Sequence, residues 1–348
     1  MIQPGSAWMQ GKGPDADIVL SSRIRLARNL KNTVFPNRLT DDRAVEMLNM
    51  IAGTVSDLEG EWNIRFEKLD NLSPIQRQVL VEKHLISPAL IEEPVKYKAA
   101  AVDEQESISI MVNEEDHLRI QILLSGLQLQ ETWTIANQLD DALEEHLDYA
   151  YDNHSGYLTA CPTNIGTAMR ASVMVHLPAL VLTRQASQVF TTLAQIGMVV
   201  RGLYGEGSDA VGNIFQISNQ VSLGLSEEEF IHNLATVTQQ IVGRERHARR
   251  HLQNNAGIVL IDRVERAWGI LTHARIMSSE EALRLLSEVK LGQDLGLLPV
   301  TNSTFTQLTL YTRPGFLQAQ AGHELQAAER DQMRAQFLRE KLHENPET

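Results

Sequence analysis

The 348-residue sequence contains a single cysteine, few aromatic residues and no long apolar run. One cysteine, Cys161, excludes an internal disulfide and favours a reducing, cytoplasmic compartment. The longest apolar stretch, residues 171–182, is interrupted by His176 and Pro178, so the sequence predicts no membrane span. The N-terminal residues do not combine a basic region with an apolar one, and we expect no secretory signal.

Basic residues are outnumbered, because 31 Lys and Arg stand against 44 Asp and Glu, a formal net charge of −13. Such a charge repels polyphosphate backbones and argues against non-specific nucleic-acid binding. Hydrophobic residues still make up 43% of the chain, as in an ordinary globular protein. At roughly 150 residues per domain, the length predicts about two domains.

The periodicity of apolar residues changes along the chain. Residues 1–20 are rich in Gly and Pro and predict an irregular lead-in. Alternation with period two between residues 96 and 124 predicts strands, and if a strand continues through Arg119 it projects Glu115, His117 and Arg119 from one face. Further strand-like runs begin at Met169 and surround residues 198–203 and 213–218.

Helical spacing and capping residues predict the other elements. Helices are expected after Thr40, after Ser73, from 128 to 151, after the capping residues Ser226 and Ser278, and from 322 to 342. Helix dominates after Ser226. The sequence therefore predicts a mixed sheet-and-helix domain over residues 21–255 and a smaller all-helical domain over 256–348.

Several arginines stand where an extended strand would present them together. Arg23 and Arg25 share one face of a strand, and two guanidinium groups so placed can grip a polyphosphate. Arg119, Arg170 and Arg201 are further candidates. From this segment alone, a solvated edge strand is the favoured interpretation of Arg23 and Arg25.

Two polar segments carry the remaining candidate groups. Residues 161–167 form a loop of Pro, Thr, Asn and Gly around the only thiol, a composition typical of a fixed turn rather than of a plain core position. Residues 201–207 place Glu206 in a Gly-rich turn that permits close approach of a ligand. Neither a Walker loop nor a strand-linked GxGxxG pattern is present, so a bound nucleotide would be held by side chains.

His247 and His251 have the i, i+4 spacing of metal ligands on a helix. Arg246, Arg249 and other arginines surround them and would repel a cation, so we favour a solvated helix face and assign no metal site.

Taken together, these segments resemble the guanidino-kinase (phosphagen kinase) family, which transfers a phosphoryl group from ATP to a guanidino nitrogen. The resemblance rests on Cys161–Thr167, on the run Val112–Arg119 (VNEEDHLR) and on Arg201–Glu206, and it covers about residues 20–250. It implies an α+β fold with an antiparallel sheet flanked by helices, and ATP with Mg²⁺ as cofactors.

The resemblance also implies roles for individual residues. Nucleotide phosphates would be held by Arg23, Arg25, Arg119, Arg170 and Arg201. The substrate guanidinium would lie between Glu115 and Glu206 with Cys161 beside it, Glu115 being the expected base, although the two glutamates could exchange roles. Met174 and Tyr204 depart from the pattern of small-molecule kinases, which usually have His and Arg there.

The bacterial protein-arginine kinase (McsB-type) branch is the most similar, because the N-terminal helical domain of small-molecule kinases is missing before Arg23. It implies arginine-bearing protein substrates, a role in stress response, an activator protein, a Clp-type unfoldase or protease system, and a homodimer formed through the C-terminal domain. It also implies an allosteric phosphoarginine site at Arg330, Asp331, Arg334 and Ala335. A small-molecule guanidino kinase and a non-catalytic phosphoarginine adaptor are the alternatives.

Overall fold

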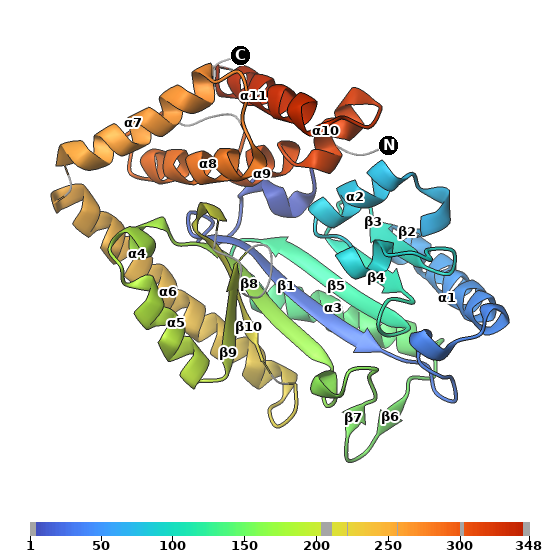
Figure 1. Cartoon of the computed structure of the whole chain (residues 1–348). Coiled ribbons are helices and arrows are strands. Elements are labelled where there is room, and N and C mark those ends of the chain that lie inside the picture. Colours follow the sequence, from blue (N-terminus) through green and yellow to red (C-terminus); the bar gives the residue numbers. More distant parts are fainter. Residues whose placement is uncertain (1–4, 203–210, 221, 256, 300–302, 344–348) are drawn as a thin grey trace.

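The structure is a computed structural model that describes residues 5–202, 211–220, 222–255, 257–299 and 303–343. Within these residues, eight strands form one antiparallel sheet in the order β2-β3-β4-β5-β1-β8-β10-β9 (Figure 1). The strands are β1 Val19–Arg28, β2 Ile64–Lys68, β3 Ala99–Asp103, β4 Ile108–Val112, β5 Leu118–Ser125, β8 Met169–His176, β9 Met198–Gly202 and β10 Ile214–Asn219. A separate short hairpin joins β6 Tyr151–Asp152 to β7 Gly156–Tyr157. The helices are α1 Asp41–Trp62, α2 Pro74–Glu82, α3 Leu129–Glu144, α4 Pro178–Leu182, α5 Ala186–Gln195, α6 Glu227–Asn255, α7 Gly257–His273, α8 Ser279–Asp294, α9 Phe305–Tyr311, α10 Pro314–Ala321 and α11 Ala327–His343.

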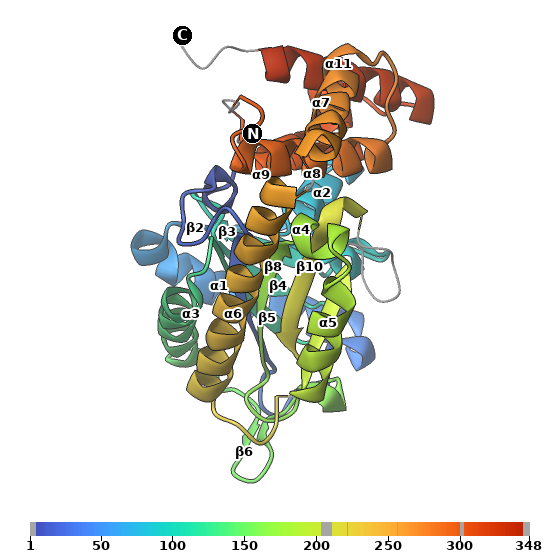
Figure 2. The ribbon, with the colours of Figure 1, turned by 90° about the vertical axis from the view of Figure 1, so that its left-hand side faces the viewer.

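One face of the sheet is apolar and buried. Alternation along β1 and β5 points Ile24, Leu26, Ile120 and Ile122 to this face, where they are fully buried. Helices α1, α3 and α6 cover it and contribute to the same core (Figure 2). The opposite face carries polar side chains in its centre, together with apolar residues such as Met111 and Leu123 that are buried in separate clusters.

Arg28 is a charged residue on the buried face, at the end of β1. Its guanidinium contacts Asp140 of α3 at 2.6 Å, and both side chains are less than a tenth exposed. The ring of Tyr157 lies 3.5 Å from the guanidinium carbon, so the β6–β7 hairpin is anchored to this ion pair. The Asp140 carboxylate and the aromatic rings raise the pKa of Arg28 despite its burial.

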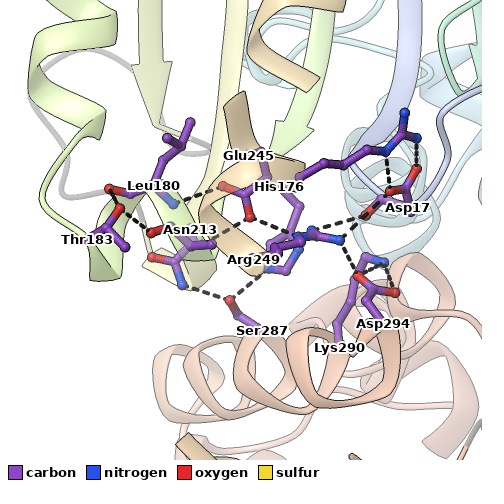
Figure 3. A network of polar contacts seen from close by, with 12 residues as sticks. Asp17, His176, Leu180, Thr183, Asn213, Glu245, Arg249, Ser287, Lys290 and Asp294 are labelled. Carbon is purple, nitrogen blue, oxygen red and sulfur yellow. Dashed lines mark hydrogen bonds and ion pairs between the residues drawn. The ribbon is translucent and has the colours of Figure 1, made fainter. Parts of the chain in front are cut away.

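A network of buried polar groups links the C-terminal helices to the sheet (Figure 3). The Glu245 carboxylate of α6 accepts hydrogen bonds from the backbone N–H groups of Ala179 and Leu180 at the start of α4. Arg249, one turn further along α6, contacts Glu245 at 2.9 Å and Asp294 of α8 at 3.0 Å. These contacts fix α8 against α6, so the helical region is attached to the sheet domain by more than the chain connection at residue 256.

A second branch of this network reaches β8 directly. The Ser287 hydroxyl of α8 lies 2.8 Å from Nε2 of His176 and accepts a hydrogen bond from the side-chain amide of Asn213, also at 2.8 Å. The His176 side chain is fully buried. Ser287 therefore joins α8 both to β8 and to the segment that leads into β10.

The class of fold agrees with the prediction, whereas several boundaries do not. The lead-in contains a 3₁₀ turn, Ala7–Gln10, whose Trp8 and Met9 are buried, and β1 already begins at Val19. The helix expected over 128–151 ends at Glu144. The helix expected over 322–342 begins later, at Ala327 of α11, because Gly322 adopts φ 78° and ends the preceding helix α10.

We predict that Asp140→Ala lowers the free energy of unfolding by about 3–5 kcal/mol, because it leaves the Arg28 guanidinium buried without a counter-ion. Urea denaturation followed by circular dichroism measures this change. Asp141→Ala, which removes an exposed carboxylate from the next position of α3, is the matched control and should change stability by less than about 0.5 kcal/mol. Equal effects of the two substitutions would contradict the conclusion that Asp140 is the counter-ion of buried Arg28.

Candidate active site

The polar face of the sheet gathers the five arginines that the sequence singled out. Arg25 of β1 lies directly opposite Arg170 of β8, and Ala27 lies opposite Arg119 of β5. Arg201 of β9 lies opposite Gln216, which in turn lies opposite Met174. The register therefore points Arg23, Arg25, Arg119, Arg170 and Arg201 to one face, which we call the arginine face.

Neutral groups rather than carboxylates accompany the central arginines. Arg23 donates to the Gln216 carbonyl oxygen at 2.9 Å and to the Ser172 hydroxyl at 3.4 Å. Nε of Arg25 is buried without a hydrogen-bond partner, and in the described part of the chain no ion pair joins Arg23 or Arg25 to a carboxylate. Two half-buried positive charges are thus left without a counter-ion.

The pKa values of these arginines reflect this crowding. Burial, together with the charges of Arg170 and Arg119, lowers the pKa of Arg23 to about 10. Burial and the neighbouring charges of Arg23, Arg119 and Arg170 lower the pKa of Arg25 well below its ordinary value. Arg23 remains protonated near neutral pH, and the mutual repulsion of the crowded arginines means that the arginine face favours a bound polyanion.

Glu115 lies at one end of the arginine face, in the turn between β4 and β5. The expectation that Glu115, His117 and Arg119 share one strand face is wrong, because residues 113–117 form a turn and β5 begins at Leu118. His117 is fully buried, with Nδ1 accepting from the N–H of Leu30 at 2.9 Å.

The turn nevertheless brings Glu115 to the arginines. Its carboxylate lies 3.3 Å from Arg119, which also contacts Glu114 at 2.5 Å. Burial raises the pKa of Glu115 even though the Arg119 charge acts in the opposite direction. A carboxylate with a raised pKa beside a cluster of cationic side chains is suited to accept a proton.

Asp116 is a residue that the sequence analysis missed. Its side chain is fully buried, and Oδ1 accepts hydrogen bonds from the side-chain amide of Asn29 at 2.6 Å and from the N–H of Ala160 at 2.8 Å. These bonds connect the Glu115 turn to the residue before Cys161. Asp116 was quoted within a motif, but only the fold reveals that it joins two loops.

Cys161 lies in the loop next to this connection, as the sequence predicted for a fixed turn. Its Sγ is 3.0 Å from the Thr163 hydroxyl, and a 3₁₀ turn follows at Pro162–Asn164. Arg28 donates to the carbonyl of Thr167 at 3.3 Å and holds the far end of the loop. The thiol is partly exposed.

The opposite end of the arginine face carries a second residue that sequence reasoning missed, His84. It lines a cavity with Arg23, Ser172, Met174 and Gln216. Burial and the charges of Arg23 and Arg313 lower the pKa of His84 to about 3, so its ring is neutral. His84 follows α2 with φ 59°, and no local pattern in the sequence indicates that it reaches the sheet.

Several residues predicted from the sequence as site candidates are not placed on the arginine face by the structure. Glu206 and Tyr204 lie outside the described residues. His247 and His251 are exposed on α6, and no group of three or more His, Cys, Asp or Glu side chains in the described chain could hold a metal ion. Within the described ranges, no helix is long and apolar enough to cross a membrane.

The C-terminal candidates differ strongly in exposure. Arg334 is 1% exposed, and its guanidinium donates to the carbonyls of Thr312 and Met277 and contacts Asp331 at 2.5 Å. Arg330 is half-buried and donates to the Leu325 carbonyl at 2.6 Å. Ala335 is fully buried. The two arginines therefore do not project together into solvent.

Comparisons with known proteins agree with this geometry. Residues 46–248 match the family described as "ATP:guanido phosphotransferase, C-terminal catalytic domain", and residues 257–348 match "Protein-arginine kinase McsB C-terminal domain". Among solved structures, a duplicated taurocyamine kinase from Schistosoma mansoni is similar with a TM-score of 0.62 and 26% identity, over 68% of this chain and 34% of that one. A lombricine kinase is similar with a TM-score of 0.61 and 25% identity, over 68% of each chain.

The sheet with its arginine face is thus the catalytic domain of a guanidino phosphotransferase, and the chain belongs to the ATP:guanido phosphotransferase family. Within it, the chain groups with the protein-arginine kinases. The protein-arginine kinase of Symbiobacterium thermophilum is 54% identical over 97% of this chain and 96% of its own length. The protein-arginine kinase of Brevibacillus brevis is 50% identical over 98% of this chain and 96% of its own length.

We predict that Arg25→Met has opposite effects on stability and on nucleotide binding. Removing one of the crowded charges should raise the melting temperature of the protein without nucleotide, because repulsion and burial of that charge are relieved. Affinity for ATP should fall by at least about tenfold, the order of one charge-assisted contact. Thermal unfolding with and without ATP measures both.

Arg43→Met, at an exposed position of α1, is the control and should leave ATP affinity unchanged. A loss of stability for Arg25→Met without nucleotide would show that Arg25 is a structural residue instead.

Proposed function

We propose that this protein is an ATP-dependent protein-arginine kinase that transfers the γ-phosphoryl group of ATP to arginine side chains of proteins. The observation that carries the proposal is the arginine face, where no carboxylate of the described residues forms an ion pair with Arg23 or Arg25, and which ends at Glu115 beside the Cys161 loop. The high identity to relatives named protein-arginine kinases supports protein, rather than a small guanidino compound, as the acceptor.

The arginine face suits an extended nucleotide. From Ser21 to Ala27, β1 spans seven residues, or about 20 Å over six steps of ~3.4 Å. We assign the base to the surface beside His84 and Met174, where a neutral ring and a thioether offer apolar contact; the enclosed space among these side chains, about 10 Å³, is too small to hold the base itself. The phosphates then lie over Arg25, Arg119 and the other arginines, and the terminal phosphate points toward Glu115.

Each group near the acceptor end has a chemical task. A guanidinium is a poor nucleophile because its pKa exceeds 12 and its lone pairs are delocalised. Glu115 aligns the acceptor guanidinium and accepts its proton, with Glu206 as the orienting partner and the Cys161 thiol beside the substrate cation. The arginines stabilise the negative charge on the transferring phosphoryl group.

Magnesium enters this scheme as part of the substrate, MgATP. Mg²⁺ keeps several of its waters and is commonly bound through substrate phosphates. The side chains of the arginine face are cationic or neutral, so they hold phosphate oxygens rather than the ion itself.

The family resemblance also implies a cellular setting. We propose a cytoplasmic protein of the stress response whose marks regulate proteins or direct them to a Clp-type unfoldase or protease, with an activator protein as a further partner. A small-molecule guanidino kinase and a non-catalytic phosphoarginine adaptor are disfavoured, the latter because Glu115, Cys161 and the arginine face are intact.

We further propose that the C-terminal domain forms a homodimer through α7. Most apolar residues of this domain pack inside the chain, as the buried Leu260, Leu271, Leu283 and Leu286 do. Ile258 is 75% exposed, and its neighbour Val259 is 72% exposed. Adjacent exposed apolar residues on a described helix favour contact with a second copy.

An allosteric phosphoarginine site beside Arg330 completes the proposal. Arg330 supplies the accessible guanidinium, whereas buried Arg334 and Asp331 hold the helix against Met277 and Thr312. Phosphoarginine bound there would act on the helical region that contacts β8 through Ser287.

Glu115→Gln should reduce transfer of label from γ-labelled ATP to an unfolded, arginine-rich protein to less than about a tenth of the wild-type rate, because the base is lost. ATP affinity should stay within about twofold. In the wild type, the rate should fall as pH decreases through a pKa above the ordinary glutamate value, since the ionised carboxylate is the active form. Retained transfer in Glu115→Gln would reject this base.

Ile258→Glu should convert a dimer into a monomer at micromolar concentration, because it places a charge in the apolar contact. Sedimentation velocity measures the change. Ile276→Glu, at another exposed apolar position that is 62% exposed, is the matched control and should remain dimeric. A monomeric wild type would refute the interface.

Arg330→Ala should weaken binding of phosphoarginine at least about tenfold when the active site is saturated with an ATP analogue. Isothermal titration calorimetry measures this affinity. Arg284→Ala, at an exposed position of α8, should bind like the wild type. Unchanged affinity of Arg330→Ala would eliminate the second site.

A further inference from the structure

A cavity of about 560 Å³ lies behind the Cys161 loop, at the end of the sheet farthest from the C-terminal helices, where Figure 1 places the β6–β7 hairpin. Its walls include Glu144 at the end of α3, Glu227 at the start of α6, and the rings of Tyr151 and Tyr157. None of these residues belongs to the arginine face or to the groups proposed for phosphoryl transfer.

The floor of this cavity is the backbone of the catalytic loop itself. A Cβ on Gly156 would lie 2.3 Å from the Gly166 carbonyl oxygen, and a Cβ on Gly166 would lie 2.5 Å from that of Ser222. The N–H of Tyr157 donates to Gly166, and the N–H of Thr167 donates to Ser222. Three backbone segments therefore pack together without room for side chains. A group bound in the cavity contacts the loop that carries Cys161.

The walls are suited to a cation. Glu144 and Glu227 are carboxylates from two different helices, and the Tyr151 and Tyr157 rings meet edge to face with centroids 5.2 Å apart. Aromatic faces beside carboxylates favour ammonium and guanidinium groups. Burial and the nearby charges of Asp140 and other acidic residues raise the pKa of Glu144, which indicates a locally negative surface.

The same hairpin already holds one guanidinium in this way. Arg28 lies 3.5 Å from the centroid of Tyr157 and is paired with Asp140. Because Arg28 is 2% exposed and neutralised by that carboxylate, it does not oppose a second cation in the cavity. Tyr151 is 56% exposed and offers its ring to an incoming side chain.

We propose that this cavity is a substrate subsite that binds a second basic side chain, lysine or arginine, of the protein whose arginine is phosphorylated. The proposal rests on the proposed function, since only a polypeptide acceptor carries such a side chain beside its target. Charge complementarity identifies the occupant: two carboxylates and two tyrosines select a cation, and the loop beneath connects it to the acceptor site.

Peptides with one arginine test the subsite directly. A lysine, which cannot accept the phosphoryl group at a guanidine, is placed at about one to six positions on either side of the arginine, with alanine as reference. We expect lysine at a restricted set of spacings to lower KM about fivefold at unchanged kcat, the scale of a cation held by one aromatic and one carboxylate contact. The preference should shrink as salt concentration rises.

Variants with matched controls locate the effect. Glu144→Gln and Glu227→Gln should abolish the lysine preference, as should Tyr151→Ser. Glu145→Gln and Glu228→Gln remove the same charge from the adjacent exposed positions and should keep it. Unchanged KM with alanine-reference peptides in all variants would separate the subsite from the acceptor site.

Lysine and alanine peptides with equal KM at every spacing would overturn the subsite while leaving the kinase intact. Equal loss of preference in the control variants would also overturn it, because a diffuse negative field would then be responsible. Failure to phosphorylate any peptide or protein would contradict the proposed function itself.

Discussion

The structure depends on an asymmetry between the two faces of one antiparallel sheet. Apolar residues such as Ile24 and Ile120 bury one face against α1, α3 and α6, and this fixes the register that points five arginines to the other. The arginines crowd each other, as the lowered pKa values of Arg23 and Arg25 show. The free energy of the hydrophobic core therefore maintains a cationic surface that is unfavourable until an anion binds.

Both ends of that surface are connected to other parts of the molecule. At one end, Asp116 links the Glu115 turn to the Cys161 loop through the N–H of Ala160. At the other end, a second cavity beside His84 is also lined by Phe305 and Arg313 from the helical region. The C-terminal helices thus reach the end of the arginine face, in addition to the contact of Ser287 with His176 on β8.

Sequence patterns predicted the parts of the site that follow from alternation along strands. Alternation predicted that Arg23 and Arg25 share one face of a strand, whereas the grouping of Arg119, Arg170 and Arg201 with them was implied by the family resemblance. His84 and Asp116 could not be predicted, because each acts through residues distant in sequence. The exposed partner of a helical pair was also not predictable: spacing alone put Arg330 and Arg334 together, whereas carbonyls of Thr312 and Met277 hold Arg334 inside.

The most direct test of the account presents the protein with γ-labelled MgATP and two acceptors at equal arginine concentration, free arginine and an unfolded arginine-rich protein. The account predicts acid-labile label on the protein and none on free arginine. Label on free arginine alone would assign a small-molecule guanidino kinase, and label on neither acceptor would contradict phosphoryl transfer.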